Sequence, residues 1–264
     1  GKSSKRPYNP RGKMFGYHVL GFGSGVAAGL LPLQQGIFPF GYSFVVATDV
    51  GTDFGTSNIV NSSGVMQSDT AAVGTAKAQG AGATFGGDKG IHAFGRGTSA
   101  NISISNLISN VGVVSTDVTG VGTARLELSA VSYGVGLALF AFGTTSSGVT
   151  NIKNLVSDAG VVASDSTGVG TASTSRYETS FGGLSAGTAL IALGSASATR
   201  NLVSNTGVIA TNTTIGNASS RTQGAGCTFG EDRGILMTGS GNVSNIVSNT
   251  GAIADDVSYV GSLT

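Results

Sequence analysis

The sequence is informative first through what it lacks. Its 264 residues include one cysteine, no tryptophan and two histidines, and only 10% of them are charged. The single cysteine, Cys227, excludes a disulfide within the chain, and we interpret it as a small buried hydrophobic side chain. No HExxH, GxSxG or Cys/His metal spacing occurs. We therefore predict a protein that is not an enzyme and uses no cofactor or metal.

Long helices and membrane-spanning runs are also missing. Glycine, with 44 residues, interrupts nearly every window of ten, which disfavours helices. The most apolar stretch, residues 14–33, contains several glycines and His18, whereas a membrane span needs about 20 mostly apolar residues. Hydrophobic residues make up 40% of the chain, and short apolar runs recur at regular intervals. We therefore predict a folded chain, and we predict no membrane span.

Acidic residues are absent before Asp49, and this sets the N-terminus apart from the rest. Five of the 14 basic residues lie within the first 13 positions, namely Lys2, Lys5, Arg6, Arg11 and Lys13. Two prolines among them disfavour helix and sheet. We predict that residues 1–13 form an extended basic arm that docks on a partner, with a solvated tail as the plain alternative.

The remainder of the chain is organised around one repeated phrase. It reads NLISNVGVVSTDVTGVGTA at residues 106–124 and recurs at 154–172 and from Asn201, with altered copies from Asn58 and Asn245. Three columns keep their character in every copy. The first is glycine at Gly64, Gly112, Gly160, Gly207 and Gly251; five positions later stand Asp69, Asp117, Asp165, Asn212 and Asp256; ten positions later stand Gly74, Gly122, Gly170, Asn217 and Gly261. Such residues favour turns.

Short β-strands are expected between these turns. Pairs such as Val113-Val114 are β-branched, and apolar runs bounded by glycine, such as GIHAFG at 90–95, suit buried strands. A repeat of about 47 residues with four short strands has the size of one propeller blade. We predict an all-β propeller of about five four-stranded blades, in preference to a solenoid, a sandwich or an intertwined fibre.

The two ends of the repeat array suggest how such a ring closes. The copy from Asn245 stops at Thr264, while GIFPFG at 36–41 matches the GIHAFG phrase without a first half before it. We predict that N-terminal strands complete the last blade, or alternatively that residues 14–44 form a sixth blade. The expected division is the arm, 1–13, and a propeller, 14–264, comprising 14–57, repeats 58–105, 106–153, 154–200 and 201–244, and a half repeat, 245–264.

The repeated phrase also resembles a known group of proteins. Residues 106–124, 154–172, 201–211 and 86–95 (GGDKGIHAFG) are similar to the kelch-like repeats of bacteriophage tail and fibre proteins, notably from phages of aquatic bacteria. The resemblance covers roughly residues 36–264. It implies a β-propeller located on a virion, although fold alone does not give function.

Candidate binding residues are few. The aspartate column could form a ring of carboxylates for Ca²⁺ or a sugar, but recurrence at turns favours a structural role. His92 falls in a predicted strand and is interpreted as a packing residue. The variable segments 144–150, 173–178 and 195–200 are candidate contact loops, and Arg176, Tyr177 and Glu178 form the most binding-like cluster.

Together these features predict a non-enzymatic structural protein of a phage particle, present in multiple copies. Its arm would dock on other virion proteins, and its propeller would contact a host-surface glycan or a neighbouring subunit. The alternative is a carbohydrate-binding, lectin-like propeller outside any virion.

Overall fold

The protein's computed structural model describes residues 16–17, 19–20, 36–45, 50–170, 179–192, 199–215, 225–229, 232–237 and 243–258. Over these residues the fold is all-β, as predicted. Every strand pairing is antiparallel, and the helical content of the described ranges is one 3-10 turn, Ser185–Gly187. None of the described residues belongs to a helix that is long and apolar enough to cross a membrane.

Five sheets follow one another along the chain. The first contains β3 (Gly36–Val45) and β4 (Val50–Val60), and the second contains β5 (Ala81–Phe85), β6 (Lys89–Ala93) and β7 (Ser105–Ile108). The third contains β8 (Ser129–Tyr133), β9 (Leu137–Ala141), β12 (Ile152–Val156) and β13 (Ser166–Thr167). The fourth contains β14 (Thr179–Gly182), β15 (Ala189–Ala192), β16 (Thr199–Val203) and β17 (Thr213–Thr214). The fifth contains β18 (Ala225–Phe229), β19 (Arg233–Met237), β20 (Val243–Val247) and β21 (Val257–Ser258).

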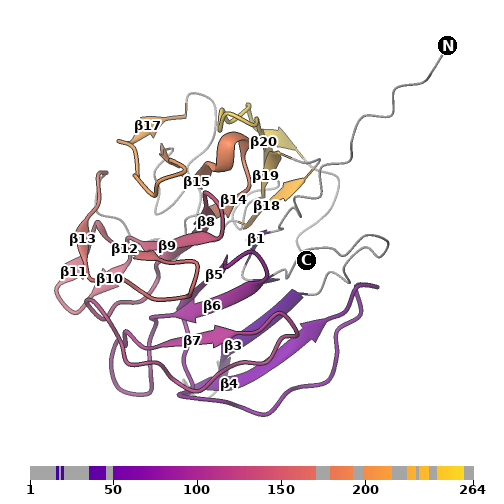
Figure 1. The fold of residues 1–264 in the computed structure, drawn as a ribbon, viewed down its shortest axis with the longest axis vertical. Coiled ribbons are helices and arrows are strands. Elements are labelled where there is room, and N and C mark those ends of the chain that lie inside the picture. Colours follow the sequence, from indigo (N-terminus) through magenta and orange to yellow (C-terminus); the bar gives the residue numbers. More distant parts are fainter. Residues whose placement is uncertain are drawn as a thin grey trace.

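Two small hairpins accompany these sheets. One joins β1 (Gly16–Tyr17) to β2 (Val19–Leu20), and the other joins β10 (Thr144–Thr145) to β11 (Gly148–Val149). Strand β1 lies against β14 and β18, whereas β2 lies against β3 and β5. The first hairpin therefore lies between strands from both ends of the array, and β1 is visible near the middle of Figure 1.

Each sheet is built from parts of two successive sequence repeats. In the third sheet, β9 pairs with β12 across the boundary between repeats 106–153 and 154–200. The last sheet likewise has four strands, because β18 pairs with β19, β19 with β20, and β20 with β21, all within residues 225–258. In the described residues these four strands include none from the N-terminus, and the closure of the last blade by N-terminal strands stays a prediction. Neighbours along the chain pair first because short connections make that pairing easy.

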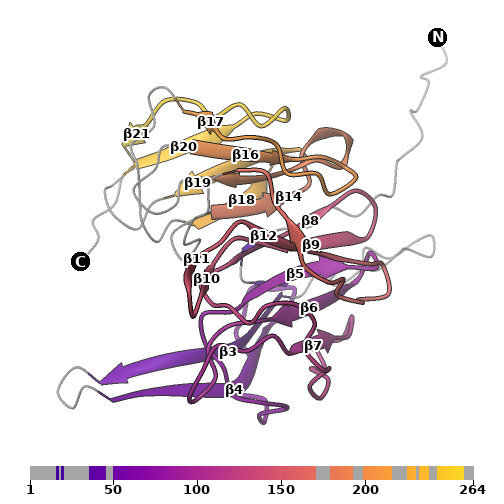
Figure 2. The same cartoon turned by 90° about the vertical axis from the view of Figure 1, so that its left-hand side faces the viewer.

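The sheets lie side by side through their first strands. Strand β5 contacts β8, β8 contacts β14, and β14 contacts β18. Figure 1 shows the sheets passing in an arc from β3 and β4 to β18, and the turned view in Figure 2 shows them as successive layers, with the ribbon of β3 and β4 projecting from one end.

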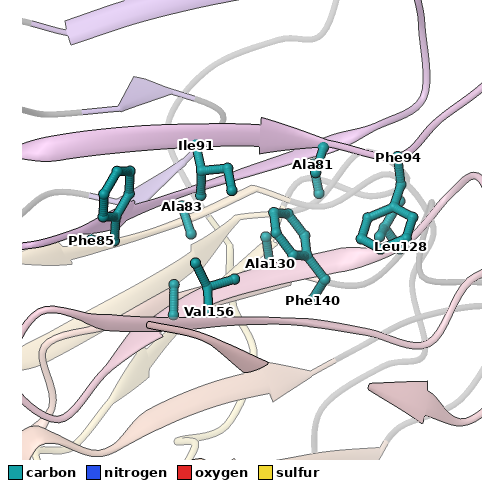
Figure 3. Close-up of a cluster of buried hydrophobic side chains, with 11 residues drawn as sticks. Ala81, Ala83, Phe85, Ile91, Phe94, Leu128, Ala130, Phe140 and Val156 are labelled. Atoms are coloured by element: carbon teal, nitrogen blue, oxygen red, sulfur yellow. The ribbon is translucent and has the colours of Figure 1, made fainter. Parts of the chain in front are cut away.

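The core lies between successive sheets. Figure 3 shows one such layer, in which Phe85, Ile91 and Phe94 of the second sheet face Ala130, Phe140 and Val156 of the third. Alternate residues of these strands point to one face, as the period of two requires. Burial of these apolar surfaces supplies the main favourable free energy of folding, about 25 cal/mol per Å². Similar clusters join the third sheet to the fourth and the fourth to the fifth.

Candidate functional site

The residues that the sequence singled out for binding fall outside the described structure. This applies to the arm residues Lys2, Lys5, Arg6, Arg11 and Lys13, and to Arg176, Tyr177 and Glu178. Their roles stay predictions. The chemistry that the structure does describe lies in the repeated phrase itself, where two buried cations meet the asparagine and aspartate columns.

The first of these arrangements, named here the lysine latch, consists of Phe40, Thr75, Lys77, Asn106 and Asp117. Lys77 and Asn106 are both 0% exposed, and the Lys77 Nζ donates a hydrogen bond to the Asn106 Oδ1. The Asn106 Nδ2 donates to the Asp117 Oδ1 at 2.9 Å. The Asp117 Oδ2 accepts from the backbone N–H of Thr75 at 3.0 Å and from its Oγ1 at 2.7 Å.

The second arrangement, the arginine latch, consists of Phe94, Thr123, Arg125, Asn154 and Asp165. The last four residues lie 48 positions after their counterparts in the lysine latch, and Phe94 lies 54 positions after Phe40. The Asn154 Nδ2 donates to the Asp165 Oδ1 at 2.9 Å, and the Thr123 Oγ1 donates to the Asp165 Oδ2 at 2.6 Å. The fully buried Arg125 donates from Nε to the Phe142 carbonyl at 2.9 Å, from Nη1 to the Thr123 carbonyl at 3.2 Å, and from Nη2 to the Asn154 Oδ1 at 2.7 Å.

Aromatic rings of the preceding sheet cover both cations. The Lys77 Nζ lies 4.4 Å from the centre of the Phe40 ring, and the Arg125 Cζ lies 4.1 Å from that of Phe94. Cations at this distance are attracted to the ring face. Phe40 lies within β3 at a register shift between Pro39 and Gly41, and Phe94 directly follows β6. Both have a positive φ, of 63° and 60°, where the chain departs from regular pairing. Each latch therefore joins two successive sheets.

Burial alters the proton affinity of both cations. Desolvation lowers the pKa of Lys77 to about 8, against the attraction of Asp117, and lowers the pKa of Arg125 to about 10, against that of Asp165. Partial desolvation acts to raise the carboxyl pKa values, but the hydrogen bonds from Thr75 and Asn106, or from Thr123 and Asn154, outweigh it. The pKa values of Asp117 and Asp165 are consequently lowered, and both carboxyls are ionised at neutral pH.

The latches explain two glycines of the third column. Gly74 and Gly122 have φ of +77° and +86°, and a Cβ there would lie 2.7 Å and 2.6 Å from the Nδ2 of Asn106 and Asn154. The first glycine column confirms the turn prediction, with φ of 76–80° in all five copies. The aspartate column differs from the prediction, since Asp117 and Asp165 bind backbone and hydroxyl groups 42 residues earlier rather than forming local turns.

The other copies keep the asparagine donor, and its acceptor is an Asp or Asn side chain. Asn58 donates to Asp69 at 2.6 Å, Asn201 to Asn212 at 2.9 Å, and Asn245 to Asp256 at 2.9 Å. The residues of this column, four Asp and one Asn, are thus distributed one to a repeat, each accepting from its own asparagine. Nor do three His, Cys, Asp or Glu side chains gather into a metal-binding cluster anywhere in the described ranges.

The remaining candidates have structural surroundings. His92 is 6% exposed and its ring lies 4.8 Å from that of Phe40, as expected of a packing histidine. Cys227 is half-buried in β18, and desolvation raises the pKa of its thiol. The Lys89 Nζ lies 3.6 Å from the Asp88 Oδ1, and an exposed ion pair of this kind contributes little to the free energy of folding. Of the predicted loops, 144–150 holds the exposed hairpin of β10 and β11, 173–178 lies outside the described residues, and 195–200 is described only at its last two residues.

Sequence reasoning missed Lys77 and Arg125. A signal was present, because both follow a Gly-Thr-Ala triplet and both precede their asparagine by 29 positions. Comparison with known proteins adds no further assignment, since no family model matches the chain and no curated protein is significantly similar to it.

Proposed function

We propose that this protein is a non-enzymatic structural component of a bacteriophage particle. The observation that carries the proposal is the use of charge in the repeats. A chain with only 10% charged residues buries Lys77 and Arg125 completely, and both serve contacts between sheets. Lys and Arg are almost never fully buried unless paired. Buried cations that connect neighbouring sheets favour a rigid scaffold. The assignment to a phage particle rests on the resemblance of the repeats.

We also propose that the sheets are five blades of a propeller whose seam is occupied by the hairpin of β1 and β2. In support, β1 lies against β14 and β18, while β2 lies against β3 and β5. The fifth sheet already has four strands, so the hairpin would fill the space between blades rather than complete one. A cryo-EM map tests this directly, because an open array of sheets without contact between first and last would refute it.

The exposed turns would provide the contact face in this proposal. Outer turns such as 109–112 and 157–160 are exposed at their tips, where Val111 is 63% exposed, and surface loops commonly carry binding functions. In the second repeat the turn is fixed to the neighbouring hairpin, because the Asn110 Nδ2 donates to the Asp88 carboxylate at 3.0 Å. The turn is therefore preorganised and presents apolar as well as polar side chains, which suits a glycan or a neighbouring subunit.

The test begins with purified virions and mass spectrometry. We expect peptides of this protein in the particle, and a protein never associated with particles would refute the proposal. Removal of residues 1–13 should abolish incorporation while the melting temperature stays unchanged. A control variant keeps the length of the arm and removes its charge. It replaces with glutamine the residues Lys2, Lys5, Arg6, Arg11 and Lys13, and it shows whether docking needs the positive charge of the arm or only its length. Binding of the free protein to a glycan array, without particle association, would instead support the lectin alternative.

A further inference from the structure

The lysine latch brings together the groups required for an amide exchange. A primary amine, the Lys77 Nζ, contacts the side-chain carboxamide of Asn106, and a carboxylate, Asp117, contacts the nitrogen of that carboxamide at 2.9 Å. Lys77 and Asn106 are 0% exposed, so water is kept from competing. We propose that Lys77 and Asn106 form an intramolecular isopeptide bond, with Asp117 as the acid–base group.

The proposed reaction balances without any co-reactant. The Lys77 ammonium first loses one proton to the solvent buffer, and the neutral amine then attacks the Asn106 Cγ to form a tetrahedral intermediate. A second proton passes from the Nζ to the Asn106 Nδ2, the Cγ–Nδ2 bond breaks, and one ammonia leaves. The product is an Nζ–Cγ amide, with no change in oxidation state.

Three features of the surroundings favour these steps. Desolvation lowers the pKa of Lys77 to about 8, which increases the fraction of neutral amine near neutral pH. The Asp117 Oδ1 already accepts a hydrogen bond from the leaving nitrogen and is positioned to carry a proton to it. Thr75 holds the same carboxylate through its backbone N–H and its hydroxyl, which fixes the geometry that proximity effects require.

The arginine latch is a natural negative control within the same chain. It has the same amide and carboxylate pair, at the same 2.9 Å separation, but presents a guanidinium. A guanidinium keeps its proton and is a poor nucleophile, so no bond is expected there. The chain also has a single cysteine and hence no disulfide within itself. An isopeptide bond between residues 77 and 106 would restrict the unfolded chain as a disulfide does.

Mass spectrometry of the full chain tests the proposal. After incubation above the pKa of Lys77, we expect the intact mass to be lower than the sequence mass by one ammonia. Lys89 and Arg96 lie between the two residues, so trypsin separates Lys77 from Asn106 unless a bond joins them. We expect a branched peptide containing both residues, and no cleavage after Lys77.

The matched variants are Lys77→Arg and Asn154→Ala. The K77R chain should fold, because Arg125 occupies the equivalent place, and it should keep the full mass. The N154A chain should still lose one ammonia, because the lysine latch is intact. A wild-type chain that keeps its full mass, with Lys77 and Asn106 in separate peptides, overturns the proposal. Loss of ammonia that persists in K77R also overturns it, because that loss would come from cyclisation of an asparagine.

Discussion

The lysine and arginine latches share one frame and differ in their cation. In both, the asparagine Nδ2 lies 2.9 Å from the aspartate Oδ1, and the threonine backbone N–H lies 3.0 Å from Oδ2. Arg125 adds three hydrogen bonds to fixed acceptors, whereas Lys77 has one, to Asn106. The frame is therefore set by Asn, Asp and Thr, and does not depend on which cation fills it.

This difference separates two uses of the same geometry. The planar guanidinium of Arg125 matches several acceptors at once and keeps its charge, so it serves as a fixed connector between sheets. The amine of Lys77 is a point donor whose pKa falls readily on burial. One latch thus holds its cation through three hydrogen bonds, and the other retains a reactive amine.

The largest expected effect comes from emptying the arginine latch. Arg125→Ala would leave the Phe142 carbonyl, the Thr123 carbonyl and the Asn154 Oδ1 without their donor. We expect the free energy of unfolding to fall by about 3–5 kcal/mol, as when one partner of a buried charged contact is removed. Denaturant unfolding measures this loss.

Lys89→Ala is the matched control, because Lys89 is an exposed residue at the start of β6 and its one ion pair in the described ranges, with Asp88, is long at 3.6 Å. Its effect on the same unfolding curve should stay within about 0.5 kcal/mol, as is usual for surface substitutions. Equal effects of the two substitutions would contradict the role assigned to Arg125.

The next effect concerns the glycine that lets the latch close. Gly122→Ala places a methyl group 2.6 Å from the Asn154 Nδ2, at a φ of +86° that alanine rarely adopts. We expect a loss of about 1–3 kcal/mol, from the strained backbone and the displaced amide. Gly64→Ala tests φ alone, because its φ is +76° and no atom lies within 4 Å of the added Cβ. If thermal unfolding shows the same loss for both variants, the close approach of Asn154 has no energetic consequence.

The sequence predicted the strands and turns well because those signals are local. Glycines such as Gly112 adopt the positive φ that their column indicated, and β-branched residues such as Val114 lie in paired outer segments. The latches were not predicted because they join residues 29 and 42 positions apart. Local turns and long-range hydrogen bonds both favour Asp and Gly. The recurring columns alone therefore did not show which of these two roles the residues have.

The sheet boundaries were missed for a related reason. The repeat was divided at its most recognisable phrase, at Asn106 and Asn154, but these residues lie inside β7 and β12 rather than between sheets. A periodic sequence gives the length of the repeat and leaves its phase undetermined. The phase is set by which strands pair, and here short hairpins such as that of β8 and β9 decide it.

The smallest expected effect separates the charge of the frame from its shape. Asp165→Asn keeps the shape, and Asn212 already occupies the equivalent place in the next copy. Because Asp165 is exposed to solvent and its charge is screened, we expect the free energy of unfolding to fall by only about 1 kcal/mol at neutral pH.

The same variant also tests the pH dependence of stability. The pKa of Asp165 in the folded state is lowered from the ordinary value of 3.8, so the ionised carboxylate stabilises the fold above that value. This contribution is lost as the pH falls through the folded-state pKa. The variant should therefore lose less stability on acidification than the wild type. Identical acid-unfolding curves for the two proteins would mean that the latch depends on geometry alone.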